Sequence, residues 1–207
     1  MQIVFISDTH GKHEQLQLPD ADMIIHAGDI TSRGTLTEAK YFIDWFAALP
    51  YRYKIFVAGN HDFCFEKTPS LAQQLVPENC IYLEDDHVLI EGLRIWGSPI
   101  SPFFHNWAFN RHRGKEIKQH WDKIPAAIDI LITHTPPHNI LDRTVDNEIV
   151  GCEELMKKIA EVAPKIHVFG HIHEAYGTAQ IGNTTFINAS VLDVRYKVKN
   201  PPILIRL

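Results

Sequence analysis

The sequence lacks the features that mark several common classes of protein. It has only three cysteines, Cys64, Cys80 and Cys152, and they are widely spaced with no CxxC pair. This usage argues against a disulfide framework and favours free thiols in a reducing compartment. No apolar run approaches the roughly 20 residues that cross a bilayer, and no basic region or cleavage site precedes the apolar residues 3–6. We therefore expect a cytoplasmic protein with neither a secretory signal nor a membrane span.

A basic stripe is also absent. The formal net charge is -5, and the nearest basic segment, residues 110–118, is short. A general nucleic-acid or acidic-membrane binder would show a larger positive surface, so we expect stable binding to neither. The chain also has no internal repeat, low-complexity tract or linker. Its 207 residues therefore predict one domain, residues 1–207, with a sizeable core.

Five short apolar runs share one design. Each is rich in β-branched or aromatic residues and hydrophobic on both faces, as strands buried in a sheet are. Each run is followed by Asp, Asn or His, in three cases through a glycine. The runs and the polar residues that follow them are 2–7 before Asp8, 23–28 before Asp29, 54–59 before Asn60, 129–133 before His134 and 165–169 before His171.

Helices and hairpins are expected in the rest of the chain. Residues 35–49 repeat apolar side chains at a helical period, and Thr35 and Glu38 have the spacing of a capping box. Further helices are expected at 151–164, 115–123 and 69–76, hairpins at 87–98 and 178–190, and an edge strand at 201–207. This order predicts an α/β protein with two packed mixed sheets flanked by helices.

The polar residues at the strand ends predict one shared site. Ligands bind beyond the carboxyl ends of the strands in open α/β sheets, so a sheet shared by these strands would gather the polar residues. Asp8 and His10 are two residues apart, as are His171 and His173. In extended chain such pairs project to one side, and the neighbouring glycines admit side chains close to one another.

The gathered side chains are carboxylates, imidazoles and one carboxamide, with no thiolate. This set suits Mn, Fe, Zn or Co. It has more ligands than one ion needs, so it favours two ions about 3.5–4 Å apart that share an Asp. Each of the five polar strand ends alone is explained by ordinary turn formation. The prediction of a metal site rests on the occurrence of all five in this order. The set is Asp8, His10, Asp29, Asn60, His61, Asp62, His134, His171 and His173. The other histidines are expected at the surface or in packing: His13, His26, His87, His105, His112, His120, His138 and His167.

At these residues the chain resembles the calcineurin-like metallophosphoesterase superfamily. The family pattern is D-x-H, G-D, G-N-H-[D/E], a strand-end H and G-H-x-H, and all five blocks occur here in order. Longer stretches, such as "WFAALPYRYKIFVAGNHD" and "WGSPISPFFHNWAFNRHRG", resemble the branch of metallophosphoesterase-domain-containing proteins with vertebrate brain and bacterial members. One departure is Asn139, near which relatives commonly carry glycine. We expect it to leave the metals unaffected and to alter the pocket beside His134.

The resemblance implies a fold and a role for each site residue. The fold is a four-layer αββα sandwich of two mixed β-sheets flanked by helices. His61 would be the acid of the GNHD motif, and Asp62 would orient it. Asp8, His10 and His173 would hold the first metal, Asn60, His134 and His171 the second, and Asp29 would bridge the two.

The resemblance also implies a reaction. Two divalent or trivalent ions, foremost Mn or Fe with Zn or Co as alternatives, would bind phosphate oxygens and convert a bridging water to hydroxide. Attack on phosphorus would then expel an alcohol, with His61 protonating the leaving oxygen. The branch favours small phosphodiesters such as 2′,3′-cyclic nucleotides. Three residues of the basic loop, Arg111, His112 and Arg113, are candidate substrate contacts. Alternatively, this loop is solvated and packs Trp107 and Phe109 on the core.

Two other functions remain open. A protein or small-molecule phosphomonoesterase would use the same metals, and a phosphopeptide compared with a diester separates these activities. A scaffold of the same fold would have lost metal ligands, whereas none is lost here. A protein without transition metal, and without diesterase activity after Mn²⁺ is added, would favour the scaffold.

Overall fold

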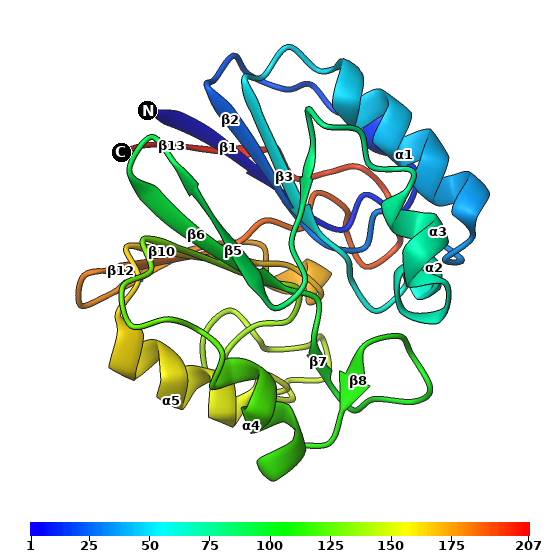
Figure 1. Ribbon diagram of the computed structural model, residues 1–207. Coiled ribbons are helices and arrows are strands. Elements are labelled where there is room, and N and C mark those ends of the chain that lie inside the picture. Colours follow the sequence, from blue (N-terminus) through cyan, green and yellow to red (C-terminus); the bar gives the residue numbers. More distant parts are fainter.

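Two β-sheets packed face to face form the centre of the computed structural model, which describes residues 1–207 (Figure 1). The first sheet has the order β13-β1-β2-β3-β4, in which β13 is antiparallel to β1 and the other neighbours are parallel. Its strands are β1 (Gln2–Ile6), β2 (Met23–Ala27), β3 (Tyr53–Val57), β4 (Ile81–Tyr82) and β13 (Ile203–Arg206).

The second sheet has the order β11-β12-β10-β9-β6-β5. Its four central strands are parallel, and the antiparallel hairpins lie at its two edges. The strands are β5 (Asp86–Ile90), β6 (Leu93–Ser98), β9 (Ile130–Thr133), β10 (Ile166–Phe169), β11 (Gly177–Ile181) and β12 (Thr184–Asn188). Both sheets are mixed, as the sequence predicts.

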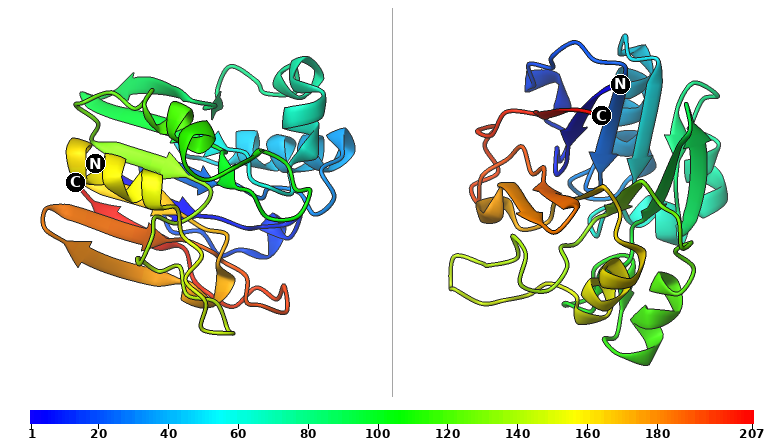
Figure 2. Two further views of the ribbon diagram at one scale, coloured as in Figure 1. Left: turned by 90° about the horizontal axis from the view of Figure 1, so that it is seen from below. Right: turned by 90° about the vertical axis from the view of Figure 1, so that its left-hand side faces the viewer.

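Helices cover the outer face of each sheet, which gives the predicted αββα layers (Figures 1 and 2). Helices α1 (Leu36–Ala48), α2 (Phe63–Lys67) and α3 (Pro69–Gln73) lie against the first sheet. Helices α4 (Lys115–Trp121) and α5 (Glu153–Val162) lie against the second. The predicted capping box is present at α1, where Thr35 Oγ1 accepts from the Glu38 N–H at 3.2 Å and Glu38 Oε2 accepts from the Thr35 N–H at 3.1 Å.

Alternating side chains build the two halves of the core. In β1, Ile3 and Phe5 point into the cluster between the sheets, whereas Val4 and Ile6 join the cluster that includes the helices. Every one of these four side chains is fully buried. Burying one such side chain contributes about 1.5–3 kcal/mol. The strands are therefore apolar on both faces because each face packs against another layer.

The predicted hairpins and edge strand are confirmed. Residues Glu91 and Gly92 connect β5 to β6 with φ of +49° and +82°, as a tight hairpin turn requires. Gly182 and Asn183 connect β11 to β12, and β13 closes the outer edge of the first sheet. The short elements that were not predicted include α2, β4 and the two-stranded sheet of β7 (Ser101–Pro102) and β8 (Asn110–Arg111). Elements of two to five residues are too short to show a period.

The five polar strand ends belong to two sheets, so the expectation of one shared sheet is wrong. Strands β1, β2 and β3 lie in the first sheet, and β9 and β10 lie in the second. Ser7 and Ser190 form a parallel bridge where the ends of β1 and β12 meet. The carboxyl ends of the strands of both sheets therefore lie close together. No helix of this structure is both long and apolar enough to cross a membrane.

Candidate metal centre

The backbone turns sharply at the candidate ligands. Asp8, His10, Asp29 and His171 have φ of +56°, +42°, +57° and +69°. The expectation that Asp8 and His10, or His171 and His173, share a side through extended chain is therefore wrong. His173 instead begins a short 3₁₀ turn, residues His173–Ala175. Such left-handed residues are uncommon and concentrate at functional sites, because the surrounding structure must hold them.

Two glycines allow the loops to approach one another. A Cβ atom at Gly170 would collide with the Asp8 carboxylate and the Ser7 hydroxyl. A Cβ atom at Gly59 would collide with the Asp29 carboxylate and the His134 ring. The prediction that glycine admits neighbouring site residues is confirmed at both positions.

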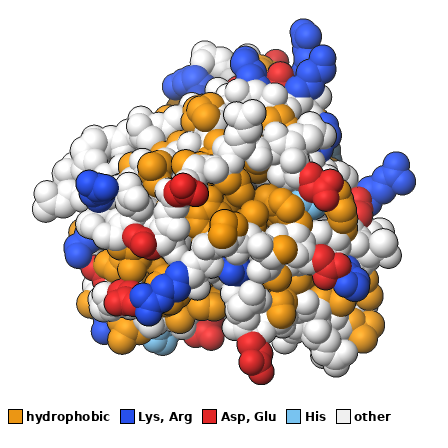
Figure 3. All heavy atoms as spheres, turned by 90° about the horizontal axis from the view of Figure 1, so that it is seen from above, with side chains coloured by type: hydrophobic (Ala, Val, Ile, Leu, Met, Phe, Trp, Pro, Cys, Tyr) orange, Lys and Arg blue, Asp and Glu red, His pale blue; other side chains and the backbone are white.

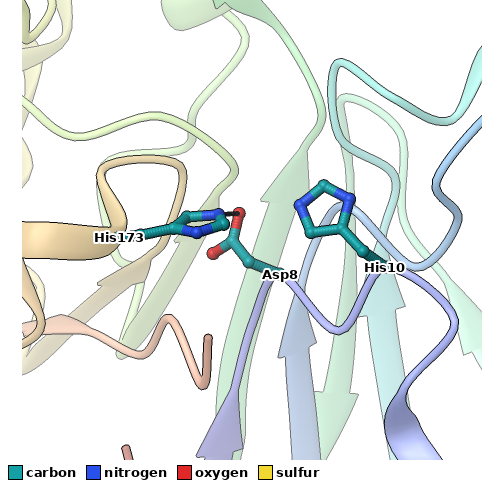
Figure 4. Close-up of side chains that lie close together, drawn as sticks. All are labelled: Asp8, His10 and His173. Carbon is teal, nitrogen blue, oxygen red and sulfur yellow. Dashed lines mark ion pairs between the residues drawn. The ribbon is translucent and has the colours of Figure 1, made fainter. Parts of the chain in front are cut away.

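The first cluster consists of Asp8, His10 and His173, with the Asp8 carboxylate between the two rings (Figure 4). His173 Nε2 lies 3.6 Å from Asp8 Oδ1. Asp8 is fully buried, and its Oδ2 accepts from the Ser190 hydroxyl at 2.6 Å and from the His171 N–H at 3.0 Å. The His171 N–H also reaches Oδ1 at 3.1 Å, so these bonds fix the carboxylate with Oδ1 toward His173.

The second cluster consists of Asn60, His134 and His171. His134 Nε2 and His171 Nδ1 each lie 2.8 Å from Asn60 Oδ1. The carboxamide oxygen thus stands between two imidazole nitrogens that come from β9 and β10. All three residues are among those that the sequence predicts for one ion.

Asp29 lies between the two clusters. Its Oδ2 is 3.6 Å from His10 Nε2 and 3.4 Å from His134 Nε2. Its Oδ1 accepts from the His61 N–H at 2.8 Å. One carboxylate oxygen therefore faces both clusters while the other is anchored, which is the arrangement that a bridging ligand needs.

Backbone carbonyls set the tautomers of three of these rings. A carbonyl can only accept, so each Nδ1 that it contacts must carry a proton, and Nε2 is the ring atom that faces the site and can bind a metal once its own proton is lost. His10 Nδ1 donates to Thr31 O, His134 Nδ1 to Ala27 O and His173 Nδ1 to Asp193 O, at distances of 2.9–3.1 Å.

The donor set fits bound cations. His10 Nε2 is buried, has no hydrogen-bond partner and faces Asp29, so it is available to bind a ligand. Two ligand atoms bound at about 2.1 Å to one ion lie about 3.0–3.5 Å apart. The separations within the clusters are close to this range. These residues can therefore hold metal ions without large rearrangement.

Burial and the neighbouring carboxylates set the charges of the centre. Burial alone lowers the pKa of His134 and of His173, but the Asp29 carboxylate raises that of His134 and the Asp8 carboxylate raises that of His173, each to about 9. Burial lowers the pKa of His171 to about 4. Burial would raise the pKa of Asp8, yet the hydrogen bond and charge of His173 hold it well below its usual value. The carboxylates therefore stay ionised near neutral pH and attract positive charge.

His61 lies beside the first cluster but is not oriented by Asp62, so that expectation is wrong. The His61 ring is half-buried, and its Nδ1 donates to Ser32 O at 3.0 Å. Asp62 is fully buried and accepts from Gly59 N–H at 2.7 Å and from Thr31 N–H at 2.8 Å. Asp62 therefore ties the loop that carries Asp29 to the loop that carries Asn60. Both of its carboxylate oxygens accept hydrogen bonds from these loops, and neither contacts the His61 imidazole.

Burial and the nearby Asp29 carboxylate raise the pKa of Asp62 to about 6, against the opposing effect of hydrogen bonds from Thr31 and Gly59. Asp8 and Asp29 each face an imidazole nitrogen, whereas Asp62 does not. The position of Asp62 is therefore that of a residue that links two loops.

A cavity of about 310 Å³ opens beside His171. Its lining includes the half-exposed rings of Phe103 and Phe104, the Arg113 guanidinium and two exposed acids, Asp146 and Glu148. The two acids were not predicted, because no local pattern in residues 144–150 indicates that they line a cavity beside His171.

The three predicted substrate contacts lie in different surroundings. Arg113 lines the cavity and donates to Val150 O at 2.6 Å and Gly151 O at 2.8 Å. Arg111 instead pairs with Glu66 at 3.4 Å, and the His112 ring stacks on Phe103 with centroids 4.6 Å apart. Only Arg113 thus reaches the cavity directly.

The alternative for this loop is correct in part. Phe109 is buried in the core, whereas Trp107 is half-buried and lies against His61 with ring centroids 4.2 Å apart. Asn139 has a φ of +65°, a conformation that glycine adopts readily and Asn tolerates. It lines a separate cavity with Arg143 and Glu174 rather than the cavity beside His171.

Three of the remaining histidines, His13, His26 and His167, are packing residues, as expected. His26 Nε2 lies 3.0 Å from Thr9 Oγ1, and His167 Nε2 lies 2.8 Å from Thr133 Oγ1. His13 is buried against the aromatic side chains of α1. Burial lowers the pKa of His26 and of His167 to about 3 each, so both stay neutral.

Comparison with known proteins gives concordant results. Residues 1–175 match the family described as Calcineurin-like phosphoesterase. Human "Metallophosphoesterase domain-containing protein 1" is 43% identical over 231 aligned positions, which cover 100% of this chain and 71% of the human protein. One solved crystal structure has a TM-score of 0.69 at 16% identity and covers 99% of this chain and 98% of its own. GAP50 of Plasmodium, described as the anchor in the inner membrane complex, has a TM-score of 0.53 at 12% identity, covering 99% of this chain and 80% of its own.

Proposed function

The chain belongs to the calcineurin-like phosphoesterase family, and from this premise we propose that it hydrolyses small phosphodiesters at a two-metal centre. The family and the candidate ligand clusters support a metal-dependent phosphoesterase. The preference for diesters, with 2′,3′-cyclic nucleotides as candidate substrates, is the finer part of the proposal.

The observation that carries the proposal is the convergence of two ligand clusters on Asp29 Oδ2. His10 Nε2 and His134 Nε2 face this oxygen from opposite clusters, at 3.6 and 3.4 Å. A centre built for one ion has no need of such a shared oxygen.

The ligand assignment follows the clusters. Members of the family typically bind two metal ions. When bound here, Mn or Fe ions, or alternatively Zn or Co, would neutralise charge on the phosphate and lower the pKa of water. Asp8, His10 and His173 would hold one ion, Asn60, His134 and His171 the other, and Asp29 both.

His61 would supply the proton to the leaving oxygen. Its Nδ1 donates to Ser32 O, so Nε2 is the ring atom that can hold a transferable proton. Its backbone N–H also fixes Asp29 Oδ1. General-acid assistance of this kind contributes roughly 10²–10⁴ in rate.

The charge of the cavity favours a diester over a monoester. Arg113 contributes one positive charge to the lining, whereas Asp146 and Glu148 contribute two negative charges. A dianionic monoester would be repelled more strongly by these acids than a monoanionic diester. The volume of about 310 Å³ suits a small organic group, and Arg113, which lines the cavity together with Phe103 and Phe104, would contact it.

A scaffold function is the second candidate, since the Plasmodium protein of similar fold is described as an anchor. The complete set of ligand residues argues for an enzyme here. One face of the molecule has acidic and basic side chains interspersed, without a basic stripe (Figure 3). The cysteines are unpaired and buried, which suits the reducing cytoplasm that we propose as its location.

A substrate panel tests the proposal. The Mn²⁺-loaded protein is assayed with bis(p-nitrophenyl) phosphate, p-nitrophenyl phosphate, a phosphopeptide, and 2′,3′- and 3′,5′-cyclic AMP. We expect the diesters to be hydrolysed with the higher kcat/KM, and His173→Ala, prepared alongside, to be inactive. A higher kcat/KM for either monoester would contradict the diester preference, and inactivity on all substrates with metal bound would favour the scaffold.

A further inference from the structure

The indole of Trp107 covers one face of the His61 imidazole. The ring centroids are 4.2 Å apart, and the planes are tilted by 31°. The indole has the same tilt to the ring of Phe63, at a centroid distance of 6.0 Å. Trp107, which is half-buried, therefore packs on the segment that follows β3.

The other contacts of the His61 ring leave this face to Trp107. Nδ1 donates to Ser32 O at 3.0 Å, and the ring meets His10 edge to face with centroids 4.6 Å apart. One hydrogen bond allows a ring to pivot about the bonded atom. His10 limits rotation of the His61 ring on one side, and Trp107 limits it on the other face.

The loop holds Trp107 firmly in this place. The Ala108 N–H donates to Asn60 O at 3.0 Å, and the Phe109 N–H donates to Glu66 Oε1 at 3.0 Å. The Phe109 side chain is almost completely buried. The residues just after Trp107 are thus bound to the segment that carries His61 and to the helix that follows it.

We propose that Trp107 is a positioning residue that holds the His61 imidazole in the orientation in which Nε2 reaches the leaving oxygen. This inference rests on the proposed role of His61 as the acid. Small displacements of a reacting group are costly in rate. Because Trp107 acts through His61, its removal matters only for substrates whose leaving oxygen needs a proton.

Two diesters with the same methyl arm separate the possibilities. Methyl phenyl phosphate releases a basic phenolate that needs protonation, whereas methyl p-nitrophenyl phosphate releases a stable anion. We expect Trp107→Leu to lower kcat about 10-fold on the phenyl ester and less than about 2-fold on the nitrophenyl ester. Trp107→Phe, which keeps a flat ring, should restore most of the lost rate. Tyr41→Leu, which removes a half-exposed ring on α1, should leave the ratio of the two rates unchanged.

A double-mutant cycle checks that the effect passes through His61. His61→Ala should lower kcat about 100-fold on the phenyl ester, and adding Trp107→Leu to it should cause no further loss. Metal content and thermal unfolding are measured for every variant. Equal losses on both esters, or losses that multiply in the double mutant, would overturn the inference. If His61→Ala keeps full activity on the phenyl ester, the proposed role of His61 as the acid is wrong. If Trp107→Leu keeps full activity while His61→Ala loses it, only the positioning role of Trp107 is wrong.

Discussion

Asp62 offers the sharpest test of how the loops of the centre are held. It is fully buried and accepts four hydrogen bonds: from Thr31 N–H at 2.8 Å, Thr31 Oγ1 at 2.7 Å, Ile30 N–H at 3.1 Å and Gly59 N–H at 2.7 Å. The substitution Asp62→Asn keeps one accepting oxygen and replaces the other with an NH₂ group. Two of the four donors then lose their acceptor and face another donor.

The expected cost follows from this count. A buried donor left unpaired costs about 1–3 kcal/mol, so two cost about 2–6 kcal/mol of unfolding free energy. Domains of this kind are stable by only about 5–15 kcal/mol in total. We therefore expect Asp62→Asn to fold marginally and to misplace the loops that carry Asp29 and Asn60.

Urea unfolding followed by circular dichroism measures this cost. The experiment is done in chelator, because bound metal would stabilise the folded state by mass action. The control is Asp44→Asn, the same change at an exposed acid that pairs with Lys40 on α1; it should change the unfolding free energy by less than about 0.5 kcal/mol. A loss below about 1 kcal/mol for Asp62→Asn, at unchanged m-value, would refute the argument.

Three further predictions concern pH, packing and substrate binding. Burial lowers the pKa of His167 from 6.5 in the unfolded chain to about 3, so the unfolded state binds the extra proton; the contribution of this residue to stability should be full above pH 6.5 and fall by about 1.4 kcal/mol per pH unit between pH 6.5 and 3. His167→Phe should reduce the slope of stability against pH by that amount in urea titrations, while His26 keeps its own contribution, and an unchanged slope would contradict this. Gly170→Ala should reduce metal content, because its Cβ would displace the Asp8 carboxylate; full metal occupancy would argue against the close approach. Arg113→Ala should raise KM several-fold for a diester while Arg111→Ala should not, since only Arg113 lines the cavity; steady-state kinetics decide, and equal effects would contradict the assignment.

Most of the strands were predictable because each carries a local pattern. An apolar run that ends in Asp, Asn or His marks both a buried strand and a functional end, as at the strand before His134. The division of these strands between two sheets was not predictable from the runs, because both sheets present the same apolar faces to their neighbours.

The candidate ligands were predictable from their residue types, whereas the contacts that orient their side chains were not. The carboxylates and imidazoles of the clusters are conspicuous next to glycines in the sequence. Backbone carbonyls such as Ser32 O and Thr31 O, which orient the rings, carry no sequence signal. The same holds for Trp107, which reaches His61 only because the loop folds back over it. Asp62 follows His61 directly, but its side chain turns toward the neighbouring loop.

The central claim is that the two clusters hold two metal ions, and counting the ions tests it most directly. The purified chain is saturated with Mn²⁺, desalted and measured by elemental analysis against protein concentration, together with His171→Ala and His173→Ala. We expect two ions per wild-type chain and one in each variant, with the remaining ion located by crystallography in the cluster that keeps its ligands. A wild-type chain that holds one ion or none, or a variant that still holds two, would contradict the account.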